Sequence, residues 1–169
     1  TMIPEIGEAG QEKLKNAKVL IVGIGGLGSP ISIYLTAAGV GQIGLIDDDI
    51  VSKSNLQRQI LYTETEIGQS KVECACRRLS ALNSSTRFET YPNRFTSDNA
   101  DRLVSAYDII IDGCDNAATR YLIDDVCSRF KKPYVYGSIS EFRGQFSVFN
   151  YRGGPRYSDL YPRPEVIPP

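Results

Sequence analysis

The residues best suited to chemistry begin with a run of glycines. Gly23, Gly25, Gly26 and Gly28 spell GxGGxG directly after an apolar stretch. Glycine permits a tight turn and lets the backbone approach a phosphate, while the helix expected to follow offers unpaired N–H groups and a partial positive charge. The pattern therefore predicts a nucleotide phosphate at this turn.

Charged residues further along the chain are suited to the rest of a nucleotide. Asp47 lies about 20 residues past the glycines, where a carboxylate accepts hydrogen bonds from ribose hydroxyls. Asp49 is a second candidate for nucleotide binding, whereas Asp48 is interpreted as a turn residue. Lys71 is expected in the first turn of a helix, where the dipole disfavours a cation. Because such local conflicts are commoner at functional sites, a phosphate-binding role is favoured for Lys71.

Two further segments carry polar groups toward the same site. The connection after Asp49 contains Asn55, Arg58 and Gln59, amides and a guanidinium that a plain hydride-transfer domain would not need. A functional role is favoured for this run, with a solvated surface turn as the alternative. Asp115 and Asn116 follow an expected strand at its carboxyl end, where open parallel sheets bind ligands. A carboxylate beside a triphosphate would be repelled unless a divalent cation lay between them, so Asp115 implies Mg²⁺. Helix capping is the alternative for this pair.

The kind of reaction follows from what the chain lacks. It contains no histidine, which removes imidazole bases and HExxH zinc sites. Arg58, Lys71 and Asp115 are the candidate catalytic residues, with Arg120 as a candidate second arginine for phosphate charge. Phosphoryl and nucleotidyl transfer depend on positioning and charge stabilisation more than on a base. ATP chemistry is therefore favoured, although Asp47 would also suit an NAD-binding oxidoreductase.

Helical and extended patterns alternate along the chain in the order that such a site requires. We expect helices at 5–17, 26–38, from 70 onward, 97–105 and 116–130, and strands at 18–23, 42–47, 86–91, 107–112 and 134–138. Ser70 and Glu73 predict a capping box at the start of the third helix. The order indicates an α/β fold, Rossmann-like and doubly wound, with a mainly parallel sheet and helices on both faces.

The last part of the sequence has a different pattern. Residues 144–151 alternate loosely, as in a mixed or antiparallel edge strand, and glycines and prolines from Gly153 onward are expected to break any regular element. We therefore predict an ATP-binding domain at 1–152 and a Pro/Gly-rich connection at 153–169 to a missing C-terminal part.

Composition narrows the classes of protein. The chain has 169 residues, of which 41% are hydrophobic and 23% charged, as in one soluble globular domain. Its 19 basic and 20 acidic residues are scattered, so nucleic-acid binding is not expected. No stretch is apolar enough for a membrane helix and no signal peptide is evident, so a cytoplasmic location is expected. Four cysteines without a CxxC pair favour reduced thiols.

The motifs together resemble a known family. In order they read LxxAKVLIVGIGGLGSP, AAGVGQIGLIDDDIVSKSNLQRQILY, IGQSK, IIDGCDNAATRY and RGQFSVFNY, and they cover nearly the whole chain. This pattern is similar to that of the ThiF/MoeB/HesA adenylyltransferases of thiamine and molybdopterin biosynthesis, which are relatives of ubiquitin-activating enzymes. The resemblance implies that 1–152 is an adenylation domain and that the complete enzyme is a homodimer.

The resemblance also implies a reaction and its residues. Such enzymes bind Mg-ATP and the C-terminal Gly-Gly carboxylate of a ubiquitin-like sulfur carrier protein, and the carboxylate attacks the α-phosphate to give an acyl adenylate and pyrophosphate. Carried onto this chain, the glycine run lies under the nucleotide, Asp47 binds ribose and Asp115 binds Mg²⁺, with Asn116 beside it. The phosphate ligands would be Asn55, Arg58, Gln59 and Lys71. A related enzyme that activates a carboxylate on modified tRNA is the closest alternative.

The sequence departs from the family pattern in two places. The RYxRQ-like segment, whose arginine reaches the partner subunit's site, would precede the first residue. The PCYRCLFP-like segment has Arg156 and Asp159 in place of the first pair of zinc-binding cysteines, so we expect no zinc site in this chain. We therefore expect the 169-residue chain alone to bind nucleotide without completing the reaction.

Overall fold

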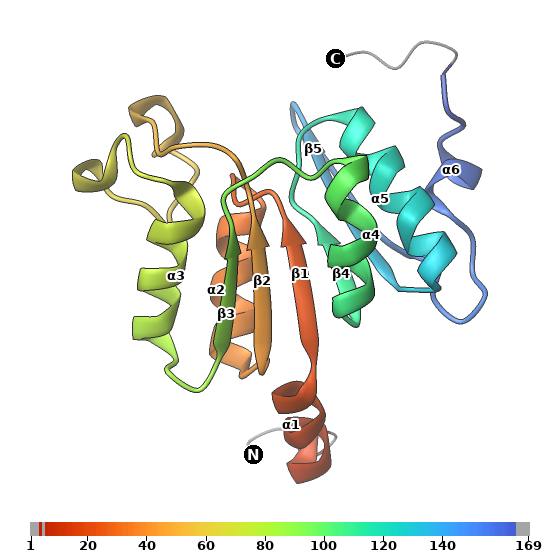
Figure 1. The fold of residues 1–169 in the computed structure, drawn as a ribbon, viewed down its shortest axis with the longest axis horizontal. Coiled ribbons are helices and arrows are strands. Elements are labelled where there is room, and N and C mark those ends of the chain that lie inside the picture. Colours follow the sequence, from red (N-terminus) through yellow and green to blue (C-terminus); the bar gives the residue numbers. More distant parts are fainter. Residues whose placement is uncertain (1–3, 5, 165–169) are drawn as a thin grey trace.

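Six strands form a single sheet in the computed structural model, which describes residue 4 and residues 6–164. The strands are β1 (Lys18–Val22), β2 (Gln42–Ile46), β3 (Arg87–Tyr91), β4 (Ile109–Asp112), β5 (Tyr134–Ser140) and β6 (Arg143–Phe149). They lie in the order β3-β2-β1-β4-β5-β6, and every neighbouring pair is parallel except β5 and β6 (Figure 1). The predicted fold class is confirmed.

Helices cover both faces of this sheet. They are α1 (Gly7–Asn16), α2 (Gly28–Ala38), α3 (Lys71–Leu82), α4 (Ser97–Ala106), α5 (Ala117–Phe130) and α6 (Tyr157–Leu160), with 3₁₀ turns at Lys53–Asn55 and Glu64–Glu66. Successive side chains of a strand point to opposite faces, so Leu20 and Val22 pack with α4 and α5 while Val19 and Ile21 pack with α2 and α3. This two-sided burial explains why β1 is an almost uninterrupted apolar run.

The turn between β1 and α2 depends on glycine. Gly23 has a positive φ of 88°, which L side chains rarely adopt, and a Cβ on Gly28 would collide with the carbonyl oxygen of Gly23. The predicted cap at Gly39 is confirmed, because its φ is 87° and its N–H bonds back to the last turn of α2. The most buried residues of α2 after Gly28 are small and polar: Ser29, Ser32 and Thr36.

The predicted capping box at the start of α3 is wrong. The Ser70 side chain makes no capping hydrogen bond, and the Glu73 carboxylate instead accepts a bond of 3.0 Å from Thr90. Ser70 forms an antiparallel bridge with Ile50, which brings the end of the 48–68 connection back beside its beginning. A tertiary pairing thus sets the start of α3, and Lys71 is its first residue as expected.

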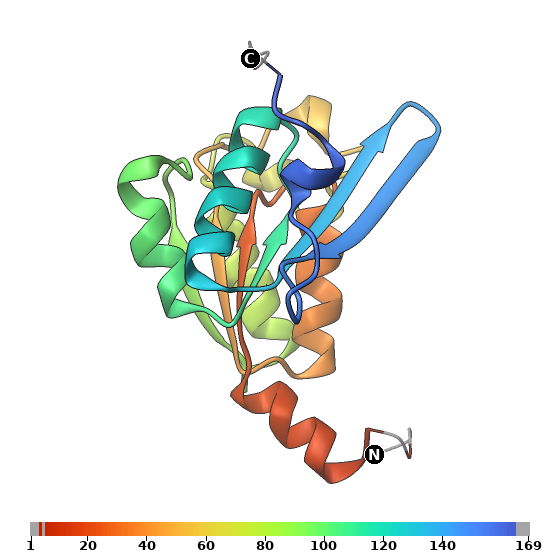
Figure 2. The same ribbon diagram turned by 90° about the vertical axis from the view of Figure 1, so that its right-hand side faces the viewer.

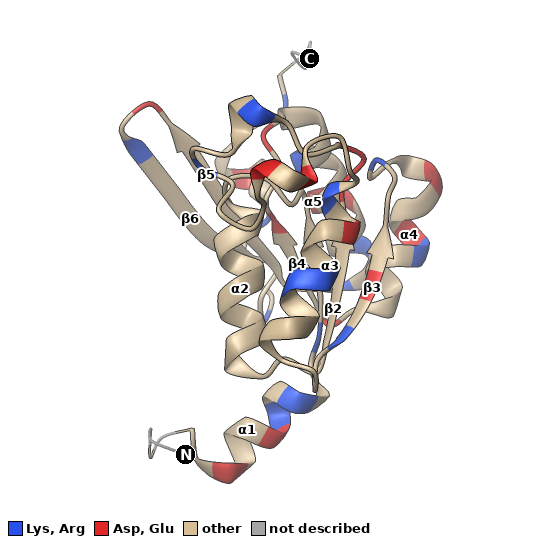
Figure 3. Cartoon of the chain, turned by 90° about the vertical axis from the view of Figure 1, so that its left-hand side faces the viewer, with Lys and Arg blue, Asp and Glu red and all other residues tan. Residues whose placement is uncertain are grey.

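Strands β5 and β6 form a hairpin that extends beyond the body of the molecule (Figure 2). The antiparallel edge predicted for residues 144–151 is confirmed, although β6 begins at Arg143. Its outward side chains include Phe146, which is 92% exposed, and the half-exposed Val148. Figure 3 shows that neither α2 nor β6 beyond Arg143 carries a charged residue.

The prediction that no regular element follows Gly153 is wrong, because α6 forms at Tyr157–Leu160. Asp124 of α5 is fully buried and accepts the N–H of Tyr157 at 2.9 Å, so a distant carboxylate holds the first turn of α6. Pro168 and Pro169 lie outside the described residues, and the domain boundary at 152–153 stays a prediction. Among the described residues, no helix combines the length and apolar character needed to cross a bilayer.

Candidate functional site

A cleft of about 720 Å³ opens at the carboxyl ends of the parallel strands, where the order reverses between β1 and β4. All the predicted site residues except Gly28 line it, namely Gly23, Gly25, Gly26, Asp47, Asp49, Asn55, Arg58, Gln59, Lys71, Asp115 and Asn116. Residues more than 90 positions apart in the chain therefore share one cavity. Gly28 contributes by allowing the close turn described above.

Two of the glycines leave room on the cleft side of the turn. A Cβ on Gly25 would lie 3.5 Å from Gln59 Nε2, and one on Gly26 would lie 3.4 Å from Cδ of Arg58. Neither position meets backbone, in contrast to Gly28. The start of α2 also lacks a side-chain cap, as expected of a helix end that binds an anion. This surface is suited to a phosphate approaching the backbone.

Asp47 follows β2 and supports the glycine turn from one side. Its Oδ2 accepts the N–H of Ile24 at 2.7 Å and its Oδ1 accepts the N–H of Asp49 at 2.9 Å. Burial raises the pKa of Asp47, while these two N–H groups and the nearby Lys71 ammonium oppose the shift. A carboxylate oxygen accepts more than one hydrogen bond, so these contacts leave acceptor capacity for a ribose.

Lys71 is buried at the edge of the cleft and is bound to one acidic residue. Its Nζ lies 2.7 Å from Oδ2 of Asp49, and its backbone N–H donates to the carbonyl of Asp49 at 3.1 Å. The Lys71 side chain is only 4% exposed, whereas that of Asp49 is 66% exposed. This ion pair accounts for the cation at the start of α3 that local rules disfavour.

Arg58 lies beside the glycine turn. Its Nη2 donates to Oδ1 of Asn55 at 3.2 Å, and its side chain is exposed beside Gly26. No carboxylate within the described part of the chain forms an ion pair with Arg58. Its charge is therefore available to a ligand in the cleft.

Asp115 and Asn116 line the cleft in the loop after β4, and their side chains differ in the hydrogen bonds that they make. The Asn116 side chain caps α5 by accepting the N–H of Thr119 at 2.9 Å. The Asp115 carboxylate is exposed, and within residues 6–164 it makes no hydrogen bond or ion pair. Asp47, Asp48 and Asp49 also gather their carboxylates within 4.8 Å, but Asp49 pairs with Lys71 and Asp48 lies 3.7 Å from Nε of Arg94. Asp115 is thus the carboxylate best suited to a divalent cation.

Comparisons with known proteins show the family to which the chain belongs. A model of the ThiF family matches residues 1–168. The chain belongs to the ThiF family. It is 48% identical over 160 residues to a probable molybdopterin-synthase adenylyltransferase of Porphyra purpurea, covering 95% of this chain and 42% of that protein. It is also 46% identical over 168 residues to a sulfur carrier protein adenylyltransferase of Thermus thermophilus, covering 96% of this chain and 62% of that protein.

The fold of this ThiF-family chain is also similar to that of solved structures. It matches the crystal structure of E. coli MccB with MccA-N7isoASN with a TM-score of 0.79 and 30% identity, over 88% of this chain and 44% of that one. The chain therefore spans about two fifths to three fifths of the length of these relatives. The resemblance drawn from the sequence motifs is confirmed.

The ThiF-family site differs from expectation at Arg120. Its Nε lies 3.2 Å from Oδ2 of the fully buried Asp112, so its charge is already compensated. Arg120 is therefore a poor second phosphate ligand, and sequence patterns had given no sign of a partner on β4. The adjoining Cys114 thiol also lines the cleft, but burial raises its pKa, which keeps it protonated and unsuited to nucleophilic attack.

Sequence reasoning missed other residues of the cleft wall. Arg94 and Phe95 follow β3, and Ser138, Ile139 and Ser140 belong to β5. Their position at or after the carboxyl end of a predicted strand could have indicated them, because the carboxyl ends of all parallel strands meet at one edge of the sheet. Asp48, interpreted as a turn residue, lines the cleft as well.

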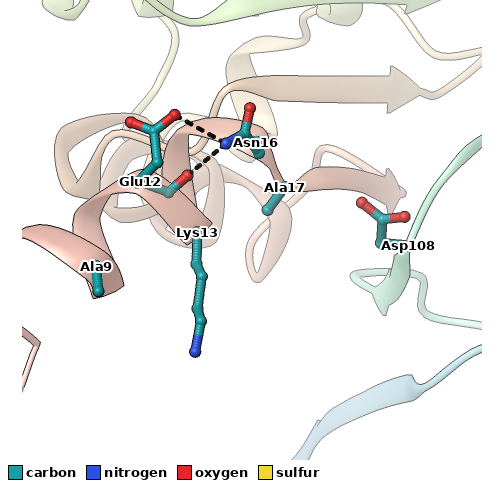
Figure 4. A pocket seen from close by; sticks show the side chains of 6 residues that line it. All are labelled: Ala9, Glu12, Lys13, Asn16, Ala17 and Asp108. Atoms are coloured by element: carbon teal, nitrogen blue, oxygen red, sulfur yellow. Dashed lines mark hydrogen bonds between the residues drawn. The ribbon is translucent and has the colours of Figure 1, made fainter.

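A second hollow lies at the opposite, amino end of the strands. It measures about 530 Å³ and lies between α1 and Asp108, which precedes β4 (Figure 4). Its polar groups mostly bind one another or the backbone: Asn16 donates to Glu12, and Asp108 accepts the N–H of Lys18. Lys13 points away from the other labelled side chains. This hollow gathers no set of groups suited to catalysis.

Proposed function

We propose that this chain is the nucleotide-binding part of an ATP- and Mg²⁺-dependent adenylyltransferase that acts on the C-terminal glycine carboxylate of a ubiquitin-like sulfur carrier protein. One observation carries the proposal: a single cleft gathers the glycine turn, the cations Arg58 and Lys71 and the uncompensated carboxylate of Asp115. The chain contains no histidine that could act as a general base. The names of the Porphyra and Thermus relatives support the same activity.

The described contacts suggest how the nucleotide would be held. Phosphates would lie over Gly25 and Gly26 at the start of α2, within reach of Arg58 and Lys71. The remaining polar groups would complete the nucleotide site: Asp47 at the ribose, Asp49 through its bond to Lys71, and Asn55, Gln59 and Asn116 around the phosphates. Lys71 would exchange part of its interaction with Asp49 for a phosphate oxygen.

Magnesium fits the donor groups present. Mg²⁺ is usually bound by one or two carboxylates together with substrate phosphates and water, and Asp115 offers one exposed carboxylate on the cleft. When bound there, Mg²⁺ would neutralise charge on the triphosphate. Asp115 would hold its carboxylate toward the phosphates. Asn116, by capping α5, would hold the backbone next to Asp115 in place.

The proposed reaction needs charge stabilisation and no proton transfer. A carboxylate oxygen of the carrier's last glycine forms a bond to the α-phosphorus, and the bond from that phosphorus to the bridging oxygen breaks. Pyrophosphate leaves with the electron pair, and the carrier becomes an acyl adenylate. Arg58 and Lys71 would stabilise the negative charge that spreads over the phosphate oxygens.

Carrier-dependent exchange of labelled pyrophosphate into ATP tests the proposal on the protein in its natural full length. We expect exchange with a carrier that ends in Gly-Gly and none with the same carrier lacking its final glycine. Absence of exchange with every Gly-Gly carrier would refute the proposed substrate, and tighter binding of NAD than of Mg-ATP would refute the proposed nucleotide. The Gly-Gly terminus, the homodimer and the cytoplasmic location stay predictions.

A further inference from the structure

Asp112, the last residue of β4, is a buried carboxylate that does not line the cleft. It is fully buried, and each of its oxygens is used. Oδ1 accepts the N–H of Cys114 at 2.8 Å, while Oδ2 accepts Nε of Arg120 at 3.2 Å and the hydroxyl of Tyr134 at 3.0 Å. Burial of a charge is costly unless it is paired and hydrogen-bonded, and here three donors from different elements satisfy it.

Arg120 extends this contact to the same loop residue. Its Nη2 donates to the carbonyl oxygen of Cys114 at 3.0 Å, and its guanidinium carbon lies 5.5 Å from the centre of the Tyr136 ring. The Arg120 side chain is only 15% exposed. Cys114 is therefore held at both its N–H, by Asp112, and its C=O, by Arg120.

The residue after Cys114 is Asp115, whose side chain has no partner within residues 6–164. Its position in the cleft is consequently set by the backbone on either side. On one side is the doubly bound Cys114, and on the other is Asn116, which caps α5. The loop is also tied to β1, because Gly113 donates its N–H to the carbonyl of Val22 at 2.8 Å.

We propose that Asp112, Arg120 and Tyr134 form a clamp whose role in the reaction is to position Asp115. The clamp joins β4, α5 and β5, and it binds both backbone polar groups of Cys114, the residue that precedes Asp115 in the loop. Asp112 and Tyr134 do not line the cleft. Arg120 lines it, but its guanidinium is bound by Asp112 and by the carbonyl of Cys114, so we treat all three as positioning residues. The role of Asp115 rests on the proposed function, whereas the contacts within the clamp stand independently of it.

A double-mutant comparison tests whether the clamp acts through Asp115. Asp112→Asn keeps an oxygen acceptor but removes the charge that Arg120 needs, and we expect it to lower pyrophosphate exchange by ~10-fold or more, since small misplacements of catalytic groups have effects of that order. Asp115→Asn alone should lower exchange further. If the clamp acts through Asp115, the double variant is no slower than Asp115→Asn, whereas multiplied losses would overturn the proposal.

A second readout does not depend on the carrier. Calorimetric titration of ATP at several Mg²⁺ concentrations should show that Asp112→Asn needs at least several-fold more Mg²⁺ to reach the wild-type affinity, with Mg²⁺-free ATP binding unchanged. Unchanged dependence on Mg²⁺ would overturn the proposal. Wild-type protein that binds Mg-ATP but performs no exchange would instead contradict the proposed substrate and leave this comparison valid.

Asp124→Asn is the matched control. Asp124 is also fully buried, pairs with Arg156 at 3.0 Å and accepts the N–H of Tyr157. It lies on α5, one turn after Arg120, and does not line the cleft. We expect its substitution to affect unfolding but not the Mg²⁺ dependence. If Asp112→Asn does not fold, Tyr134→Phe removes one hydroxyl and keeps both charges; a Mg²⁺ dependence identical to wild type would then refute the clamp.

Discussion

Replacing Lys71 by Met separates the stability of the chain from its proposed activity. The side chain of Lys71 is 4% exposed, and its ammonium lies 2.7 Å from the carboxylate of Asp49. Two unit charges about 4 Å apart attract by about 4 kcal/mol at an effective dielectric constant near 20. Because Asp49 is 66% exposed, solvent screens the pair, and a net coupling of ~1 kcal/mol is the better expectation.

The substitutions Lys71→Met and Asp49→Asn should therefore differ in their effect on the free energy of unfolding. Met keeps most of the buried stem of Lys71 and removes the charge that must be desolvated, so Lys71→Met should change the free energy of unfolding by no more than ~1 kcal/mol. Asp49→Asn leaves the ammonium buried without a charged partner and should lower it by ~1–2 kcal/mol. Lys71→Met should nevertheless slow pyrophosphate exchange by ~10²-fold, as loss of a charge that stabilises a transition state does.

Urea unfolding of Lys71→Met and Asp49→Asn measures their free energies of unfolding. Pyrophosphate exchange at saturating ATP then measures the activity of Lys71→Met. Lys71→Arg serves as the control, because it keeps the charge while changing its geometry. A loss of more than ~3 kcal/mol in Lys71→Met would show that Lys71 is a structural residue and refute the reasoning. An Asp49→Asn variant as stable as wild type would show that Asp49 does not compensate the buried charge.

Three further outcomes are expected. Arg58→Ala and Asp115→Ala should each lower pyrophosphate exchange by ~10²-fold with unfolding unchanged; wild-type rates would contradict the site. Gly28→Ala should lower stability by ~2–3 kcal/mol, because its Cβ meets backbone, whereas Gly26→Ala should be nearly as stable as wild type but bind ATP less well. Burial raises the pKa of Cys127 from 9.0 to about 12, so the unfolded chain loses this proton first and stability falls as pH rises above 9. Between pH 8 and 10 the free energy of unfolding should fall by ~1.4 kcal/mol through this group. Urea unfolding of Cys127→Ala at the two pH values should not show this decrease.

Features encoded by neighbouring residues were predictable from the sequence. The apolar run Lys18–Val22 and the glycines after it predicted β1 and its turn. A strand buried on both faces requires apolar residues, and a positive φ favours glycine, so both features can be recognised from residue type. Gly39 predicted the end of α2 for the same reason. Asp115 and Asn116 line the cleft as expected, because the carboxyl ends of parallel strands share one edge of the sheet.

Features that depend on distant contacts were not predictable in this way. Ser70 has the residue type of a helix cap, but its pairing with Ile50 replaces that role. Arg120 has the appearance of a phosphate ligand until Asp112 and Cys114 are found within hydrogen-bonding distance. Likewise α6 forms in a region rich in glycine and proline because Asp124, more than 30 residues earlier, binds its first turn.

The β5–β6 hairpin has a consequence for the behaviour of the chain in solution. Within the described residues, β6 pairs on one side only, and Phe142 and Phe146 project from the hairpin almost fully exposed. A strand edge of this kind, apolar and free of Lys, Arg, Asp or Glu after Arg143, is a template for pairing between molecules. The 169-residue chain should therefore self-associate, so that the light scattered per unit of protein mass increases as its concentration rises.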